Sequence, residues 1–525
     1  MTTVLAEVED ALGADPEVVR VPALVRGRLV LAPRPNGGAS AASHVGRYTP
    51  ARAERLRVDG AYALRRPILD PGGGGPTGAS QTVLLPAVEP SALLEHDPGA
   101  CATLARLPFA EVLDYVAALR TALAEREPLV HALAAAAAAS SPAGARLTAA
   151  GVEMVRGMLD AGALADAVDR DLGGPGRRYL DEWVAAGAGA RSGIAAELSR
   201  RLFAGGPGVT AAPQVRAFPT RQLHITAGNA LAIPVVCLLR ALATKSPAVI
   251  KSSSESFVAG ALLAVAMHAV DPDHPLTRHT SLVCWPGGDR RIEDRLFAPG
   301  AFDRLVVWGS AATLAAVRAR APRSRTLFLE PRTGVSLIGN EALRDGQATA
   351  VRAAADSLAD DQQACSASLI HYVEGSAEAA RGYCEALRAV LARWDAALPH
   401  TPTADAIGRR RLLRRGRLAG ADWYVNPGGS AVVCTNAPPD VEEHPAGRCV
   451  VVVPVASLDD AVAAAHSGIS TVGIAPESRR ATLRDAIAAR GVSHVVPLGE
   501  ADRVFAGMPH DGMRILSQLV NWATA

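Results

Sequence analysis

The sequence lacks several short motifs that would assign a protein to a class directly. It contains no Cys-x-x-Cys and no His-Glu-x-x-His, and the neighbouring His268, His274 and His279 have no tightly spaced ligand pair beside them, so we expect no metal site. No Gly-x-Gly-x-x-Gly follows a predicted strand and opens a helix, so the common dinucleotide-binding fingerprint is absent. Nucleotide binding must therefore be argued from a larger set of residues.

The sequence also has little net charge and no long apolar run. Lys plus Arg number 54 against 52 for Asp plus Glu, which gives no reason to expect nucleic acid or an anionic membrane as a partner. The most apolar stretches, 131–140 and 231–243, predict no transmembrane helix, because the first is too short and the second contains Arg240. The N-terminus lacks the basic and apolar regions of a secretory signal, and the seven cysteines are an odd number, so we expect reduced thiols and a cytoplasmic protein.

A chain of 525 residues is too long for one ordinary core, so we expect more than one domain. From about residue 215, short apolar strands alternate with helices, as in QLHITAG followed by IPVVCLLRALAT. This alternation predicts parallel sheets covered by helices. The first 200 residues contain a predicted helical block near 104–139 and no chemistry that we assign. The segment 341–358 is the expected boundary between two α/β domains.

Polar residues follow several of the predicted strands, where ligands bind in parallel sheets. Lys251 ends the strand PAVIK and can hydrogen-bond ribose hydroxyls or a phosphate, although a solvated loop lysine is an equally good interpretation. Ser254 is a candidate cap for the next helix. Gly309 allows close approach of a ligand, and Ser310 can cap a helix whose N-terminal N–H groups attract phosphate. An ordinary capped turn explains the Gly-Ser pair as well.

Three further residues have the chemistry of a catalytic site. Asn229 follows a strand and either donates to an oxyanion or forms a turn. Glu330 ends an apolar strand and is either a general base or an ion-pair partner. Cys365 lies in the polar loop DDQQACSAS and is either a nucleophile or a small residue between a helix and a strand. Cys237 and Cys284 lie within apolar patterns and are expected in the core.

The order and spacing of these residues resemble the aldehyde dehydrogenase superfamily. In particular, the motifs HITAGNA, VIKSSSES, VVWGS, DQQACSAS, GRCVVVVPV and HDGMRILSQLVNW resemble those of the LuxC-type acyl-CoA reductases. The resemblance covers about residues 215–525. Two motifs depart from the aldehyde dehydrogenase pattern: EPRTG replaces Glu-Leu-Gly-Gly-Lys, and EEHPAGRC replaces the distal glutamate block, with Glu443 or His444 near the expected position.

The resemblance implies a fold with two parallel-sheet α/β domains and a helical N-terminal lead-in. Residues 1–345 would hold the lead-in and the nicotinamide-cofactor domain, 346–500 the catalytic thiol domain, and 501–525 a tail that returns to the core or to an oligomer interface. It further implies a homo-oligomer.

The implied activity is the reduction of an acyl thioester, from acyl-CoA or an acyl carrier protein, to an aldehyde with NADPH or NADH. Cys365 would be the nucleophile, and the Asn229 amide and the Cys365 backbone N–H would hold the oxyanion. Glu330 would be a water-activating base, a proton relay or a cofactor contact. The cofactor would be bound by four residues, Lys251, Ser254, Gly309 and Ser310.

Two alternatives share this fold. An NAD(P)-dependent aldehyde dehydrogenase would oxidise an aldehyde to an acid, with Glu330 activating water. A non-catalytic partner subunit would keep the fold without turnover, but it has no reason to retain Asn229, Lys251 and Cys365 together.

Overall fold

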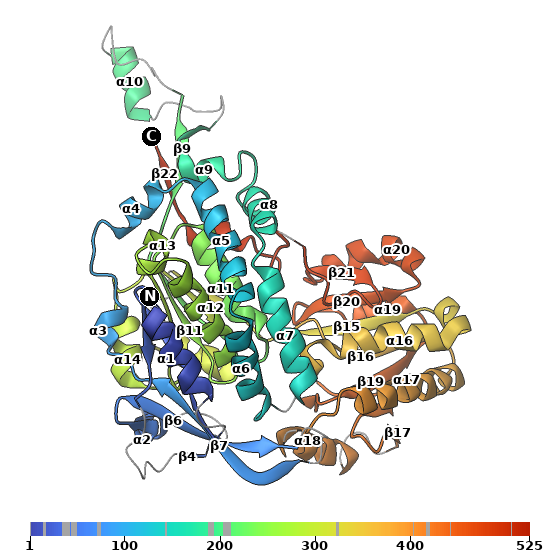
Figure 1. The fold of residues 1–525 in the computed structure, drawn as a ribbon. Helices are drawn as coiled ribbons and strands as arrows, with labels where there is room; N and C mark the ends of the chain where they lie inside the picture. Colours follow the sequence, from blue (N-terminus) through green and yellow to red (C-terminus); the bar gives the residue numbers. More distant parts are fainter. Residues whose placement is uncertain are drawn as a thin grey trace.

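The computed structural model describes residues 2–13, 17–33, 42–43, 50–70, 75–141, 144–186, 194–202, 212–321, 325–402, 404–415, 420–440, 443–505 and 507–525 (Figure 1). Two α/β units, each built on a seven-stranded sheet, form the body of the molecule. Within the described residues, none of the helices has the length and apolar content needed to cross a membrane.

The first sheet combines five parallel strands with two antiparallel strands from the N-terminus. Its order is β14 (Thr326–Leu329), β13 (Arg304–Trp308), β10 (Gln222–Ile225), β11 (Ala248–Ser252), β12 (Thr280–Cys284), β2 (Pro22–Val25) and β3 (Arg28–Leu31). The strands from β14 to β12 are parallel, so their carboxyl ends lie at one edge. β11 is buried along its whole length, as its apolar sequence predicts.

Helices cover this sheet in more than one layer. α12 (Phe257–Val270) is buried almost throughout, because the N-terminal helices α5 (Phe109–Ala124) and α6 (Glu127–Ala138) pack on its outer side. The apolar residues of α5 recur every three or four positions and enter the same core cluster. The remaining helices of this unit are α1 (Thr2–Gly13), α3 (Pro90–Leu93), α4 (Ala100–Arg106), α7 (Gly144–Met158), α8 (Ala161–Leu172), α9 (Arg178–Asp181), α11 (Ala232–Ala243), α13 (Pro275–Arg278), α14 (Arg290–Leu296) and α15 (Ala311–Arg318).

The N-terminal region contains more β-structure than the expected helical lead-in. In addition to β2 and β3, it forms a sheet around a long hairpin of β6 (Ala61–Leu69) and β7 (Pro76–Pro86). β1 (Val18–Arg20), β4 (Ala42–Ser43), β5 (Arg57–Val58) and α2 (Pro50–Leu56) complete it. Glycine and proline are frequent around residues 70–80 and are typical of a loop, but β7 begins at Pro76.

The second sheet is parallel except at one edge. Its order is β17 (Asp422–Val425), β18 (Ala431–Cys434), β19 (Cys449–Val455), β16 (Ser368–Glu374), β15 (Thr333–Ile338), β20 (Ile469–Ala475) and β21 (His494–Pro497). Only β17 is antiparallel to its neighbour. One face packs on α16 (Gly346–Ser357) and α17 (Ala377–Ala397), and the other on α19 (Leu458–Ala463) and α20 (Glu477–Ala488). Leu413 of α18 (Ala404–Arg415) belongs to the core cluster on the same face as α19 and α20.

The chain passes from the first sheet to the second between β14 and β15, across residues 330–332. The expected boundary at 345/346 lies beyond this point, after β15 and the 3-10 helix Asn340–Asp345. β15 was grouped with the preceding strands because strand–helix alternation does not reveal which sheet a strand enters. The structure confirms two α/β units with predominantly parallel sheets.

The C-terminal segment crosses back to the first unit. Ile515 and Leu519 of α21 (Ile515–Leu519) pack on Val306 and Leu329 of the first sheet. β22 (Asn521–Thr524) pairs with β9 (Gln214–Phe218), which pairs with β8 (Val184–Ala185). Beside this small sheet, α10 (Ile194–Leu202) projects away from the body of the molecule (Figure 1).

Candidate active site

The carboxyl edge of the first sheet and the amino edge of the second lie next to one another. Only residues 330–332 separate the end of β14 from the start of β15. Asn229, which follows β10, donates a hydrogen bond from Nδ2 to the carbonyl of Gln363, five residues before β16, at 2.9 Å. Residues expected to bind cofactor and residues expected to perform chemistry therefore come from two facing edges.

Cys365 lies on the second of these edges, just before β16, and its side chain is exposed. Its carbonyl accepts a hydrogen bond from Ser470 Oγ at 2.6 Å, and Ser470 Oγ also lies 3.3 Å from the carbonyl of Thr333. The pKa of the Cys365 thiol is raised, first because the surrounding loop limits hydration of a thiolate and then because of the negative charge of Asp511. The other six cysteines are buried or half-buried: Cys101, Cys237, Cys284, Cys384, Cys434 and Cys449.

The backbone leading to Cys365 adopts an unusual conformation. Asp360, Asp361 and Gln362 have φ values of 46°, 54° and 68°, in the left-handed region that costs about 1–3 kcal/mol for each such residue. Such a conformation persists only when surrounding contacts determine it. The loop before the cysteine is thus held by its environment rather than by its own backbone preference.

Two contacts to the start of β19 hold this backbone. The Gln362 amide donates from Nε2 to the Cys449 carbonyl at 2.6 Å and accepts from the Cys449 N–H at 3.0 Å. The carboxylate of Asp361 accepts from Arg448 Nε at 2.6 Å, and the Arg448 side chain is 1% exposed. Arg448 also pairs with Asp395 at 3.1 Å and donates to the Leu398 carbonyl. A fully buried guanidinium therefore links the loop before Cys365 to the neighbouring strand.

The Asn229 side chain contacts the loop that carries Cys365. One N–H of its side-chain amide donates to the Gln363 carbonyl, two residues before Cys365. A carboxamide carries two N–H donors, so this bond orients the group while the second N–H remains for another acceptor. The structure thus brings Asn229 and Cys365 together, although they are far apart in sequence.

Lys251 lies on the carboxyl half of β11 and is mostly buried. Its Nζ lies 5.8 Å from the centre of the Trp285 ring, which follows β12. Ser254 does not cap the next helix as the sequence suggested, because α12 begins at Phe257 with Ser256 at the N-cap position. The carbonyl of Ser254 instead accepts a hydrogen bond from Arg66 of the β6–β7 hairpin.

Gly309 and Ser310 follow β13 at the same edge. Ser310 Oγ accepts a hydrogen bond from the Thr313 N–H at 3.3 Å and caps α15 as predicted. A Cβ at Gly309 would lie 2.9 Å from Thr313 Cβ, so this turn accepts no larger residue without movement. β13 lies next to β10 although β11 and β12 come between them in sequence, which makes this turn part of the topological switch point where such sheets bind ligands.

Glu330 lies at the end of β14 and is engaged with another side chain. Its Oε1 is 2.5 Å from Arg318 Nη2, and the side chain is 57% exposed. The Arg318 guanidinium also lies 4.6 Å from the centre of the Phe328 ring. The sequence left Glu330 as either a general base or an ion-pair partner, and the structure shows the ion pair.

Near the expected distal glutamate, His444 is buried. Its Nδ1 accepts the N–H of Ala446 at 3.1 Å, and burial lowers the pKa of its imidazole to about 3. His444 thus stabilises a turn as a neutral imidazole.

The histidines noted in the sequence have separate partners. His268 Nδ1 contacts the Gly27 carbonyl, and His279 Nδ1 lies 2.8 Å from Glu95 Oε2. His274 caps α13. In the part of the chain that the structure describes, His, Cys, Asp and Glu form no cluster of three or more suited to a metal ion.

Several residues at this site were missed by the sequence analysis. Arg332 precedes β15, and its Nε lies 3.4 Å from Asp511 Oδ1. His510 packs edge-on against Trp308 with ring centres 4.7 Å apart. The only signal for Asp511 and His510 was the motif HDGMRILSQLVNW, whose role no local pattern defines.

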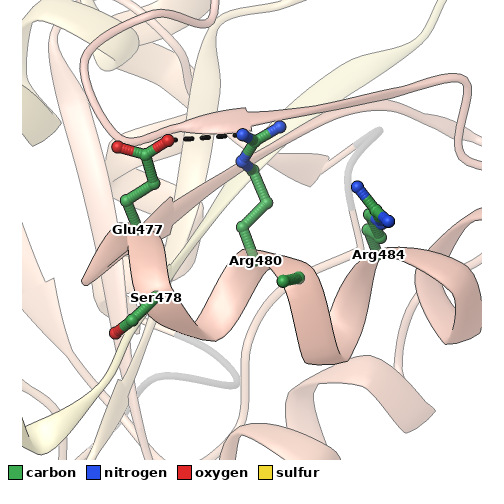
Figure 2. A pocket seen from close by; sticks show the side chains of 5 residues that line it. Glu477, Ser478, Arg480 and Arg484 are labelled. Atoms are coloured by element: carbon green, nitrogen blue, oxygen red, sulfur yellow. Dashed lines mark hydrogen bonds and ion pairs between the residues drawn. The ribbon is translucent and has the colours of Figure 1, made fainter.

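A separate hollow lies on α20 (Figure 2). Figure 2 shows Glu477 and Arg480 paired across one helical turn, at 3.3 Å, with Arg484 one turn further on. α20 follows the carboxyl end of β20, whereas Cys365 precedes the amino end of β16, and both strands run parallel to β15. This hollow therefore lies toward the opposite edge of the second sheet.

Solved structures share this fold over nearly the whole chain. Aldehyde dehydrogenase 21 from Physcomitrella patens superposes with a TM-score of 0.68 at 14% identity, covering 97% of this chain and 98% of its own. The NADP-dependent glyceraldehyde-3-phosphate dehydrogenase from Bacillus halodurans superposes with a TM-score of 0.66 at 15% identity, covering 96% of this chain and 98% of its own. The fold is therefore that of the aldehyde dehydrogenases.

Sequence comparison narrows this class. The family described as acyl-CoA reductase (LuxC) matches residues 214–522. The long-chain acyl-protein thioester reductases of Photorhabdus laumondii and Vibrio harveyi are 28% and 27% identical over 398 and 393 residues, covering 73% of this chain in each case and 74% and 75% of the relatives. The chain belongs to the LuxC acyl-CoA reductase family, which confirms the resemblance inferred from the motifs.

Proposed function

We propose that this protein reduces the acyl group of a fatty acyl thioester to an aldehyde, with NADPH as the reductant, through an acyl-enzyme on Cys365. The observation that carries the proposal is the exposed Cys365 thiol on a rigidly held loop, with the Asn229 amide bound to that loop. Relatives named long-chain acyl-protein thioester reductases support the substrate class. The proposal covers both acyl-CoA and an acyl carrier protein as the donor of the acyl group.

The carboxyl edge of the first sheet suits a dinucleotide. Lys251 offers a cation at the end of β11, and the bare Gly309 turn, together with the capped amino end of α15, offers backbone N–H groups. The Arg66 guanidinium, although paired with Glu255 at 3.3 Å, adds positive charge beside Ser254 and favours a phosphorylated ribose. Bound there, the reduced nicotinamide supplies hydride.

In the first step, the Cys365 thiolate attacks the thioester carbonyl. A new C–S bond forms, and the carbonyl oxygen becomes an oxyanion that the free N–H of Asn229 and the Cys365 backbone N–H can hold. The oxyanion then collapses, the bond to the carrier sulfur breaks, and the carrier leaves as a thiolate that takes up a proton. Exchange of one thioester for another is nearly isoenergetic, so a cysteine suits this step.

In the second step, the acyl carbon on Cys365 accepts hydride. The resulting tetrahedral oxyanion occupies the same donors, so Asn229 serves both steps. Breakage of the C–S bond releases the aldehyde and regenerates the Cys365 thiolate. Loss of one oxyanion donor costs about 3 kcal/mol of transition-state stabilisation, and Asn229→Ala should lower turnover by about a hundredfold.

The ion pair of Glu330 favours reduction over hydrolysis. An aldehyde dehydrogenase that releases acid needs a carboxylate to activate water against the acyl-enzyme. Glu330 is paired with Arg318 of α15, which keeps the carboxylate engaged with another side chain. Glu330→Gln should therefore leave aldehyde formation within a few-fold of the starting enzyme.

We also propose a homo-oligomer. α10, which projects from the molecule, exposes Ile194, Leu198 and Leu202 at intervals of four residues, with exposed fractions of 82%, 49% and 71%. Such an apolar stripe is costly to leave in water and suits a second copy. Light scattering on a sizing column would show a species larger than one chain, and a single-chain mass would contradict this part of the proposal.

The test offers a series of fatty acyl-CoAs with NADPH or NADH and separates the products. The proposal predicts aldehyde, release of CoA thiol and a higher kcat/KM with NADPH. Formation of free acid from an aldehyde and oxidised cofactor, with no reaction of acyl-CoA, would establish the aldehyde dehydrogenase alternative instead. A properly folded protein inactive in both directions would favour a partner subunit.

A further inference from the structure

The motif HDGMRILSQLVNW is not explained by the proposed steps. In the structure, its first four residues form a tight turn at the active site. The backbone N–H and carbonyl of His510 pair with those of Met513 at 2.9 Å in both directions, and the central Asp511 and Gly512 have φ values of 50° and 77°. Asp-Gly is a preferred pair for a two-residue turn with both φ positive. The turn fixes where Asp511 points.

Two anchors hold this turn between the units. His510 packs on Trp308, at the end of β13, and the Arg240 guanidinium lies 5.3 Å from the centre of the same indole. Asp511, 7% exposed, pairs with Arg332 of the segment that joins the two sheets. The turn therefore bridges the first sheet and the start of the second.

Arg332 in turn lies beside the nucleophile loop. The next residue, Thr333, shares Ser470 Oγ with the carbonyl of Cys365. The N–H of Gly334 donates to the Ala367 carbonyl at 2.9 Å, so the start of β15 runs alongside the chain just after Cys365. The ion pair and the thiol thus belong to one small region.

Among the residues that the structure describes, several charged side chains influence the Cys365 thiol and the Asp511 carboxylate. Among these charges, Asp511 opposes the Cys365 thiolate most strongly, Asp360 opposes it less, and Arg332 favours the thiolate with the smallest influence of the three. Arg332, Arg240 and Glu330 act on Asp511, whose own pKa is raised mainly by burial. His510 remains neutral, since burial lowers the pKa of its imidazole to about 3. In the described part of the chain, no side chain donates a hydrogen bond to the Cys365 sulfur.

We propose that the Arg332–Asp511 pair is a positioning device that sets the reactivity of Cys365. Asp511 holds the Arg332 guanidinium beside the cysteine loop and opposes formation of the thiolate. Arg332 has the contrary effect and favours the thiolate. This inference rests on the proposed function only in taking Cys365 as the nucleophile.

The test measures alkylation of Cys365 by iodoacetamide against pH, with intact mass and peptide mapping to confirm the site. The thiolate is the reactive form, so the pH midpoint reports its stability. Asp511→Asn removes the opposing charge and should move the midpoint to lower pH, with about three- to tenfold faster alkylation at pH 7. Arg332→Met removes the weaker, thiolate-favouring charge and should move the midpoint to higher pH by a smaller amount, with alkylation slowed by about twofold.

Three further variants keep the test decisive. Asp511→Glu retains the charge and should restore the original midpoint, which separates charge from folding. The double variant Arg332→Met with Asp511→Asn should fall between the two single variants. Arg503→Met, on an exposed side chain of the same C-terminal region, should change nothing.

Midpoints that stay the same in Asp511→Asn and Arg332→Met, with thermal unfolding unchanged, would overturn the inference. Equal shifts in Asp511→Asn and Asp511→Glu would also overturn it, because they would show a steric effect. The assay needs neither thioester nor nicotinamide, so its outcome is independent of whether the protein reduces acyl thioesters. With acyl-CoA as the substrate, Arg332→Met should slow acylation without changing KM.

Discussion

At the carboxyl edge of the first sheet, the turn between β13 and α15 is fixed by a neighbour close in the sequence, whereas at the amino edge of the second sheet the loop before Cys365 is fixed by distant residues. Ser310 caps a helix through Thr313, three residues on. Asp361 and Gln362 are held by Arg448 and Cys449, 87 residues further along the chain. The Ser310 cap therefore depends on local sequence, whereas the position of the loop before Cys365 depends on the fold of the second unit.

Replacing Cys365, the proposed nucleophile, should have the largest effect on activity. Cys365→Ser should lower acyl-CoA reduction by about a thousandfold or more, because a serine hydroxyl is a far weaker nucleophile at neutral pH. Cys101→Ser, on a half-buried thiol outside the site, is the matched control and should keep full activity. Steady-state aldehyde production measures both, and comparable losses in the two variants would contradict the assignment of Cys365.

The next largest effect should come from the buried guanidinium at the second edge. Arg448→Met leaves Asp361 and Asp395 buried without their partner, and should lower the free energy of unfolding by about 3–5 kcal/mol. Arg381→Met breaks the exposed pair with Asp422 and should give no measurable change. Urea unfolding of the two variants tests this, and equal stabilities would show that the nucleophile loop does not depend on Arg448.

Replacing Lys251 at the first edge should affect cofactor binding rather than the chemistry of Cys365. Lys251→Ala removes a charged hydrogen-bond donor, worth about 1.5–3 kcal/mol, and should raise the KM for NADPH by about tenfold or more. The rate of Cys365 acylation in the absence of cofactor should be unchanged. If acylation fell as well, Lys251 would support the second edge and the proposed division between the edges would fail.

The smallest effect should come from the helix cap. Ser310→Ala removes the bond to the Thr313 N–H and should cost about 1 kcal/mol of stability. Ser310→Asp restores a cap but adds negative charge beside the turn that we propose to bind phosphate, so it should recover stability while weakening NADPH binding. Thermal unfolding and cofactor titration of the two variants would separate these effects. Recovery of both properties in Ser310→Asp would argue against phosphate at this turn.

Features set by local sequence were predictable. Strand–helix alternation gave two α/β units, and a serine directly before a helical pattern gave the Ser310 cap. Ser254 was assigned wrongly as a cap because α12 begins two residues later than its sequence suggested, and several serines in succession offer equivalent caps. Residue spacing alone does not show which of these serines occupies the N-cap position.

Contacts between distant residues were not predictable from one sequence. Nothing near Arg448 indicates a buried pair with Asp361, and nothing near Asp511 indicates Arg332. The hairpin β6–β7 was also missed, since glycine and proline around residues 70–80 disfavour a strand unless a partner strand stabilises it. These features arise from tertiary packing, which a local pattern does not contain.

The central claim, that Cys365 carries the acyl group on the way to an aldehyde, is tested most directly by intact mass spectrometry. The enzyme is mixed with one fatty acyl-CoA without cofactor, and NADPH is then added. We expect one acyl adduct, mapped to the peptide containing Cys365 and absent from Cys365→Ala, which disappears on addition of NADPH as an equal amount of aldehyde forms. An adduct that forms equally in Cys365→Ala, or that is discharged only as free acid, would contradict the account.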